Sequence, residues 1–143
     1  MKILIASDSH GNNEALDILF KKYKDVDLFL HAGDSESDEL RIHPFLSVRG
    51  NCDYFSFPES RLLEFPFGNI FITHKPYISV KELKDKNVKF FISGHTHVRK
   101  NEYYNGIYFI NPGAITHARD GNYNSYAILD INNDKVCINF YTL

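Results

Sequence analysis

Apolar and polar positions in the first half of the chain follow a strand–helix–strand pattern. Residues 3–6 and 26–30 are unbroken apolar runs, typical of strands that are covered on both faces. Between them, apolar residues recur at helical spacing over residues 16–23, and lysines crowd the last turn. A short polar helix is expected over residues 36–42 and a third strand over residues 45–48. The pattern therefore predicts a β-α-β unit that is extended by one strand.

Strands dominate the pattern of the second half. Residues 62–65 and 70–73 flank a Gly-Asn turn and predict a β-hairpin. The capping-box spacing of Ser79 and Glu82 predicts one short helix. Five further strands are expected over residues 89–93, 101–104, 107–110, 125–130 and 136–141. The expected fold class is α/β, a four-layer α/β/β/α sandwich of two mixed β-sheets with helices on the outer faces.

Length and composition favour one small globular domain. The 143 residues suffice for one sizeable core and are too few for two, so residues 1–143 are expected to form a single domain. The net charge of −2 gives no general basic surface for nucleic acid. Only two cysteines occur, and no apolar run approaches the ~20 residues that a membrane helix needs. These features predict a cytoplasmic protein that binds no membrane and argue against a nucleic-acid partner.

Polar residues of metal-binding type follow several of the apolar runs. The seven candidate ligands are Asp8, His10, Asp34, Asn51, His74, His95 and His97. A strand that ends in such a residue delivers it to one edge of a sheet, where neighbouring strand ends can form a site. Imidazole, carboxylate and amide ligands favour Mn, Fe, Zn, Co or Ni over calcium or a thiolate zinc site. Two such ions ~3.5–4 Å apart would bind a phosphate between them and activate a bridging water.

The motifs also occur in the order found in a known family. The series comprises residues 7–12 (Ser-Asp-Ser-His-Gly-Asn), 31–34 (His-Ala-Gly-Asp), 50–53 (Gly-Asn-Cys-Asp), 94–97 (Gly-His-Thr-His) and 111–114 (Asn-Pro-Gly-Ala). Any one motif is weak evidence. Together, over nearly the whole chain, they closely resemble the calcineurin-like metallophosphoesterases, in particular their small bacterial and archaeal phosphodiesterase branch.

The resemblance implies a ligand set for each of two divalent transition-metal ions. One ion would be held by Asp8, His10, Asp34 and His97. The other would be held by Asp34, Asn51, His74 and His95. Asp34 would bridge the two ions, and Asn51 would also touch the substrate phosphate. Manganese is the first expectation for the metal, with nickel, cobalt, iron or zinc as alternatives.

The chain departs from the family pattern at three positions. Cys52 stands where the phosphomonoesterases carry a histidine that protonates the leaving group, as is usual in the phosphodiesterase branch. Its thiol could act as a weak acid, as a steric element or not at all. Lys75 follows His74 in place of a glycine, and it either contacts a phosphate or points into water. Ala118-Arg119 stands where the family often has Pro-Arg, and Arg119 is a candidate phosphate contact.

Several other polar residues have two interpretations. His31 lies inside a predicted strand, where it is either a buried, hydrogen-bonded histidine or a support for the metal ligands. His117 lies near the Asn-Pro-Gly turn and could face the site. Asp53 either orients Cys52 or closes a turn. The sequence leaves these alternatives open.

The function implied by the resemblance is metal-dependent hydrolysis of a small or nucleotide phosphodiester by a metal-bridging hydroxide, without a covalent intermediate. The catalytic residues would be Asn51 and Cys52, and the substrate contacts Asn51 and Arg119. The alternative is a non-catalytic interaction scaffold, because the retromer subunit of this fold works mainly in that way. The complete ligand set favours the enzyme. A homo-oligomer is compatible with the sequence, which specifies no subunit contact.

Overall fold

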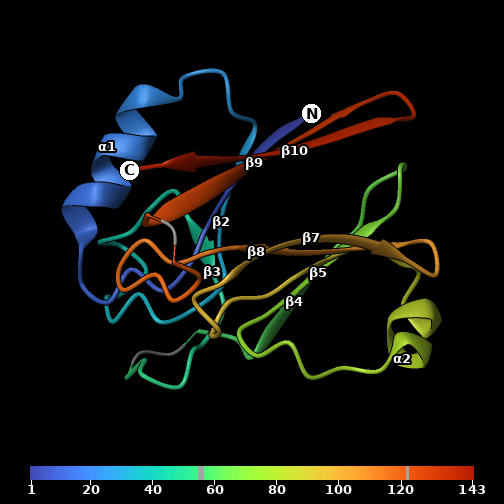
Figure 1. Ribbon diagram of the computed structural model, residues 1–143, viewed down its shortest axis with the longest axis horizontal. Coiled ribbons are helices and arrows are strands. Elements are labelled where there is room, and N and C mark those ends of the chain that lie inside the picture. The colour runs from blue at the N-terminus through green and yellow to red at the C-terminus, as the bar shows by residue number, and fades with distance from the viewer. Residues whose placement is uncertain (55–56, 122) are drawn as a thin grey trace.

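Two five-stranded β-sheets make up the framework of residues 1–54, 57–121 and 123–143, the part of the chain that the computed structural model describes (Figure 1). The strands of the first sheet are, in spatial order, β10 (Lys135–Thr142), β9 (Ser125–Asn132), β1 (Lys2–Ala6), β2 (Leu28–His31) and β3 (Leu46–Ser47). In this sheet β1, β2 and β3 pair in parallel, whereas β9 is antiparallel to both of its neighbours. The sheet is therefore mixed, as predicted.

The second sheet contains the predicted hairpin. Its strands are, in spatial order, β4 (Ser60–Leu63), β5 (Asn69–Thr73), β6 (Val88–Ile92), β8 (Ile107–Pro112) and β7 (Arg99–Tyr104). The hairpin strands β4 and β5 are antiparallel, and so are β7 and β8. In contrast, β6 runs parallel to both β5 and β8. The carboxyl ends of β5 and β6 therefore lie at the same edge of this sheet.

Alternating side chains along the strands divide the core between two layers. On β1, Ile3 and Ile5 point between the two sheets, where they join one buried cluster with residues such as Phe90 of the second sheet. Leu4 and Ala6 point the other way, into a second cluster. Because successive side chains of a strand face opposite sides, one continuous apolar run supplies both layers.

The two helices of the described residues cover the outer faces. Helix α1 (Asn13–Lys22) packs Leu16 and Leu19 against the outer face of the first sheet. Helix α2 (Val80–Asp85) places Leu83 on the outer face of the second. The predicted order of four layers is thus confirmed, with one helix in each outer layer (Figure 1). Neither helix has the length and apolar character needed to cross a membrane.

The prediction of a helix over residues 36–42 is wrong. This segment forms turns instead, and its loop packs Ile42 and Phe45 into the cluster beneath α1. The Glu36 N–H donates to Asp53 Oδ1 and the Ser37 N–H to Ser35 Oγ, and these bonds hold the loop in place. Glu36 itself has a φ of +54°, outside the helical region. Strand β3 is also shorter than expected.

Candidate metal centre

The candidate ligands lie in the loops that leave five strands at neighbouring sheet edges. Residues 8–10 follow β1, Asp34 follows β2, Asn51 follows β3, His74 follows β5, and residues 95–97 follow β6. Five of the ligand candidates have φ values between +45° and +70°, namely Asp8, His10, Asp34, His95 and His97. Residues other than glycine rarely adopt this left-handed backbone conformation. Where they do, they often lie at functional sites, in tight turns that direct a side chain toward a ligand. The two sheets thus aim these side chains at one another.

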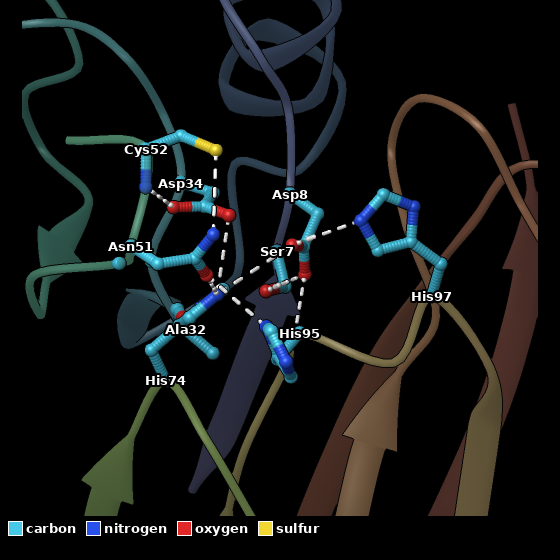
Figure 2. Close-up of polar contacts among 12 residues, drawn as sticks. Ser7, Asp8, Ala32, Asp34, Asn51, Cys52, His74, His95 and His97 are labelled. Carbon is cyan, nitrogen blue, oxygen red and sulfur yellow. Dashed lines mark hydrogen bonds and ion pairs between the residues drawn. The ribbon is translucent and has the colours of Figure 1, made fainter.

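One group of contacts joins Asp8, His10 and His97 (Figure 2 shows the Asp8–His97 contact). His97 Nε2 lies 3.2 Å from Asp8 Oδ1, and His10 Nε2 lies 3.4 Å from His97 Nε2. Asp8 Oδ2 accepts hydrogen bonds from Ser7 Oγ at 2.6 Å and from the His95 N–H at 3.0 Å. Asp8 Oδ1, by contrast, is buried and has no hydrogen-bond donor among the described residues. A buried carboxylate oxygen without a donor is costly unless a cation binds it.

A second group of contacts joins the remaining ligand candidates (Figure 2). His74 Nε2 lies 3.2 Å from Asp34 Oδ2 and 2.9 Å from Asn51 Oδ1. His95 Nδ1 lies 3.1 Å from the same Asn51 oxygen. Asp34 offers ligand atoms within 4.8 Å of both His10 and His74, so it lies between the two groups. The structure therefore brings all seven sequence-predicted ligand residues into one connected cluster.

Hydrogen bonds fix the tautomers of three of the histidines. The Nδ1 atom of His74 lies 2.7 Å from the carbonyl oxygen of Ala32, and that of His97 lies 2.7 Å from the carbonyl oxygen of His117. The Nδ1 atom of His10 lies 3.0 Å from a carboxylate oxygen of Glu36. Since these oxygens only accept, each Nδ1 carries the proton, and in the neutral ring Nε2 presents a lone pair.

These lone pairs point at further acceptors rather than at donors. The Nε2 atoms of His10 and His97 face each other and Asp8 Oδ1, and that of His74 faces the oxygens of Asp34 and Asn51. An oxygen acceptor that orients the remote ring nitrogen is the usual support of a metal-binding histidine. The donor set of imidazole, carboxylate and amide groups suits divalent transition metals. The residues present therefore fit such ions.

The buried environment shifts the acid–base equilibria of the second group. Burial raises the pKa of the Asp34 carboxyl, but the adjacent His74 ring and the hydrogen bond from the Cys52 N–H outweigh it and hold the pKa at about 2. Burial lowers the pKa of His74, yet contacts with Asp34 and Asp8 give a net increase. Burial, followed by the charges of His74 and Lys75, lowers the pKa of His95. Asp34 is thus a carboxylate at neutral pH.

Asp53 connects the two loops that carry Asp34 and Asn51. Its carboxylate accepts the N–H groups of Gly50 at 2.6 Å, Glu36 at 2.8 Å and Asp34 at 2.9 Å. Asp53 also closes the turn through its own N–H, which donates to the Gly50 carbonyl oxygen. The turn was one of the two roles predicted for Asp53, whereas the connection to Asp34 was not predicted. Only its place within the Gly-Asn-Cys-Asp motif signalled a role.

Two glycines permit the close approach of neighbouring loops. A side chain at Gly50 would overlap the carboxylate of Asp34, and one at Gly94 would overlap the hydroxyl of Ser7. Each glycine immediately precedes a ligand candidate. Backbone that passes so near another side chain has no room for a Cβ.

Cys52 and Arg119 contact the cluster mainly through their backbone. The Cys52 N–H donates to Asp34 Oδ1 at 2.7 Å, and its thiol lies 3.5 Å from Asn51 Nδ2. Burial, and then the carboxylates of Asp34 and Glu36, raise the pKa of the thiol, so it is protonated at neutral pH. The Arg119 N–H donates to the His97 carbonyl oxygen at 2.9 Å, while its side chain is exposed.

Of the two other histidines near the cluster, His31 is buried and His117 is exposed. His31 is fully buried and hydrogen-bonds Ser9 Oγ at 2.9 Å and the Gly33 N–H at 3.1 Å, which matches the first of its two interpretations. Burial lowers its pKa to about 4. The His117 ring lies 6.3 Å from the His10 ring, between centroids, and its carbonyl orients His97. His117 therefore borders the cluster.

Known proteins share both the sequence and the fold. The probable metallophosphoesterase YsnB of Bacillus subtilis is 34% identical over 99% of this chain and 90% of its own length. Phosphodiesterase YfcE of Escherichia coli is 27% identical over 91% of this chain and 88% of its own length. These relatives match the chain from end to end rather than at the motifs alone.

Solved structures with this fold include both phosphoesterases and Vps29. A predicted phosphoesterase from Streptococcus pneumoniae has a TM-score of 0.89 at 27% identity, over 99% of this chain and 88% of that one. Vps29 of Entamoeba histolytica, crystallised with zinc, has a TM-score of 0.78 at 23% identity, over 99% of this chain and 92% of that one, and shows the fold alone. The family model of the calcineurin-like phosphoesterase superfamily domain matches residues 1–134, and this chain belongs to that superfamily.

Proposed function

We propose that the chain is a dinuclear metal-dependent phosphodiesterase that hydrolyses a small or nucleotide phosphodiester. The observation that carries the proposal is the convergence of imidazole Nε2 atoms on oxygens of Asp8 and Asp34, while the Nδ1–H of each ring is held by another acceptor. The name of YfcE supports a diester as the substrate. Two divalent ions would neutralise the phosphate and lower the pKa of a bound water.

The ligand assignment follows the two groups of contacts. We assign Asp8, His10, Asp34 and His97 to one ion. We assign Asp34, Asn51, His74 and His95 to the other. Asp34 would bridge the two ions, because its carboxylate lies between the groups. Manganese is the first choice, with nickel, cobalt, iron or zinc as alternatives.

The protein's own groups bind the substrate and move the proton. The Asn51 amide lies at the surface of the cluster, where its N–H donors can hold a phosphate oxygen. Cys52, whose thiol is protonated at neutral pH in the metal-free protein, would donate weakly to the departing alkoxide. The exposed guanidinium of Arg119 contacts the phosphate from the loop that also orients His97. Such a weak acid suits substrates with good leaving groups.

The test is hydrolysis of bis-p-nitrophenyl phosphate beside p-nitrophenyl phosphate. Protein stripped of metal should be inactive, and addition of Mn, Ni, Co, Zn or Mg in turn should restore diester cleavage. Asp34→Asn should abolish it, because an amide cannot bridge two ions in the same way. A preference for the monoester, or full activity of Asp34→Asn, would overturn the proposal.

A non-catalytic scaffold is the second candidate, because Vps29 has this fold. The complete ligand cluster supports the enzyme, and turnover of a phosphodiester is what distinguishes it from a metal-binding scaffold, since Vps29 too was crystallised with zinc. Metal binding at both positions without turnover of any phosphodiester would favour the scaffold.

A further inference from the structure

A cleft of about 600 Å³ opens directly beside the second group of ligand candidates. Asn51 and His74 belong both to that group and to the wall of the cleft. The segment between β5 and α2, which carries His74, also lines the cleft with Lys75, Tyr77 and Ile78. A phosphodiester held at Asn51 therefore has room to place one of its two ester substituents in this cleft, whose volume is that of a small-molecule site.

The cleft combines apolar surfaces with an exposed aromatic ring. Phe71 and Ile78 contribute apolar atoms to its lining. Tyr77 is 77% exposed, and its ring stands edge-on to that of His95 with 6.4 Å between centroids. An aromatic side chain that remains so exposed beside a catalytic centre offers a face on which a planar group can stack.

Hydrogen-bonding groups of both kinds line the same cleft. Arg49 and Lys75 supply donors, whereas Glu59 and Glu82 supply acceptors. The Arg49–Glu59 ion pair is long, at 3.6 Å, and largely exposed, so both groups can exchange it for a ligand. Lys75 forms no ion pair with any residue that the structure describes. A planar ligand with both donors and acceptors on its edge would satisfy this mixture.

Resting on the proposed function, we propose that this cleft is a nucleoside subsite, in which the base of a nucleoside phosphodiester stacks on Tyr77. A nucleobase is the planar group that carries both hydrogen-bond donors and acceptors at its edge. The residues that make the subsite include Lys75 and Tyr77, which lie one and three positions after the ligand candidate His74 in the chain. The residues that would select a nucleoside substrate thus lie in the same loop as this ligand candidate.

The experiment compares two ligands that differ only by the base. Binding of adenosine 5′-monophosphate and of ribose 5-phosphate to the manganese-loaded protein is measured by calorimetry, with uridine 5′-monophosphate as a second base. The wild-type protein should bind at least one nucleotide about tenfold more tightly than the sugar phosphate. Tyr77→Ala should reduce the affinity for the nucleotide to that for ribose 5-phosphate, without changing the latter. Tyr77→Phe should keep the tenfold difference between the two affinities.

Tyr103→Ala is the matched control, because Tyr103 is also exposed but lies on β7, outside the cleft. Equal affinity of all three ligands for the wild-type protein, or an unchanged ratio in Tyr77→Ala, would overturn the subsite. Hydrolysis of bis-p-nitrophenyl phosphate, measured in parallel, tests the proposed function separately. A protein that cleaves this diester but shows no base preference would retain the function and lose the subsite.

Discussion

His10 differs from the other oriented histidines in the group that holds its Nδ1–H. Backbone carbonyls hold His74 and His97, whereas the Glu36 carboxylate holds His10 at 3.0 Å. A backbone acceptor cannot be removed by substitution, but a side chain can. At the residue scale, Glu36 is therefore the group through which the orientation of one candidate ligand can be tested without touching that ligand.

Glu36→Ala should weaken metal binding by about 10-fold to 100-fold, because the His10 ring loses its orienting acceptor. Calorimetric titration of the metal-free protein with Mn²⁺ or Zn²⁺ measures the change. Glu39→Ala is the control, since Glu39 is an exposed glutamate in the same loop and carries the same charge. Equal affinities for the two variants would contradict the role of Glu36.

Cys52→Ala should slow the cleavage of esters with poor leaving groups more than that of esters with good ones. A donated proton matters most when the departing alkoxide is basic, so we expect a loss about tenfold greater for a phenyl than for a p-nitrophenyl ester. Rates for both esters in the wild type, Cys52→Ala and Cys52→Ser provide the measurement. The same loss for both esters would show that the thiol donates no proton.

The buried His31 should make the metal-free protein less stable at acidic pH. Its pKa is about 4 in the folded chain, against about 6.5 when unfolded, so the unfolded chain binds more protons between these values. The free energy of unfolding should therefore fall as the pH drops from about 6.5 to about 4, by on the order of 2 kcal/mol. The lowered pKa of Asp34 changes the stability only at pH values below this range. The raised pKa of His74 favours the folded chain as the pH falls, which opposes the effect of His31.

Urea unfolding at about pH 7 and about pH 4.5 measures the effect of His31. His31→Gln removes the titrating group and should flatten the dependence of stability on pH. A variant with the same pH dependence as the wild type would assign the loss of stability to other groups.

At the scale of elements, loops rather than strands hold the candidate site together. The Asp53 carboxylate joins the loop after β2 to the loop after β3 by accepting three backbone N–H groups. Strand β3 has only two residues, so its own ladder gives this region little support. The helix predicted over residues 36–42 does not form, because Glu36, which would begin it, has a φ of +54° and is held in the loop through its N–H by Asp53.

Asp53→Asn should destabilise the protein by about 2–4 kcal/mol, because an amide presents one acceptor oxygen where three N–H groups need acceptors. Thermal and urea unfolding of the metal-free protein measure the loss. Asp134→Asn, in the exposed turn between β9 and β10, is the control and should change stability by less than about 0.5 kcal/mol. Similar stabilities for the two variants would contradict the proposed connection.

At the scale of the whole molecule, the ligand candidates come from both sheets. Asp8 and Asp34 follow strands of the first sheet, whereas His74, His95 and His97 follow strands of the second. Ions bound between them would connect the two halves of the sandwich. The same carboxylates and lone pairs repel one another without a cation, so the folded protein should gain stability on metal binding.

Removal of metal with a chelator should therefore lower the melting temperature. At a free metal concentration of 100 times Kd, the bound ion contributes about 2.7 kcal/mol. Differential scanning calorimetry with and without Mn²⁺ measures the shift, and Asp34→Asn should reduce it strongly. A melting temperature that does not respond to metal would contradict binding at this cluster.

The sequence by itself determined the strands, the layers and the seven ligand candidates of this protein. Apolar runs and turn residues are local signals, and the motifs after the strands contain the chemistry within a few consecutive residues. The hairpin of β4 and β5 was predicted correctly because a local Gly-Asn turn joins its strands. The helix over residues 36–42 was not, because contacts with residues distant in the chain hold that segment in turns.

Only the tertiary structure decided the contacts between segments far apart in the chain. Glu36 lies 26 positions from His10, and Asp53 lies 19 positions from Asp34, so no local pattern marks either pair. The cleft beside Asn51 likewise arises from three separate segments. Such contacts depend on how the two sheets stack and how the loops turn, which the sequence specifies only through the free energy of the whole fold.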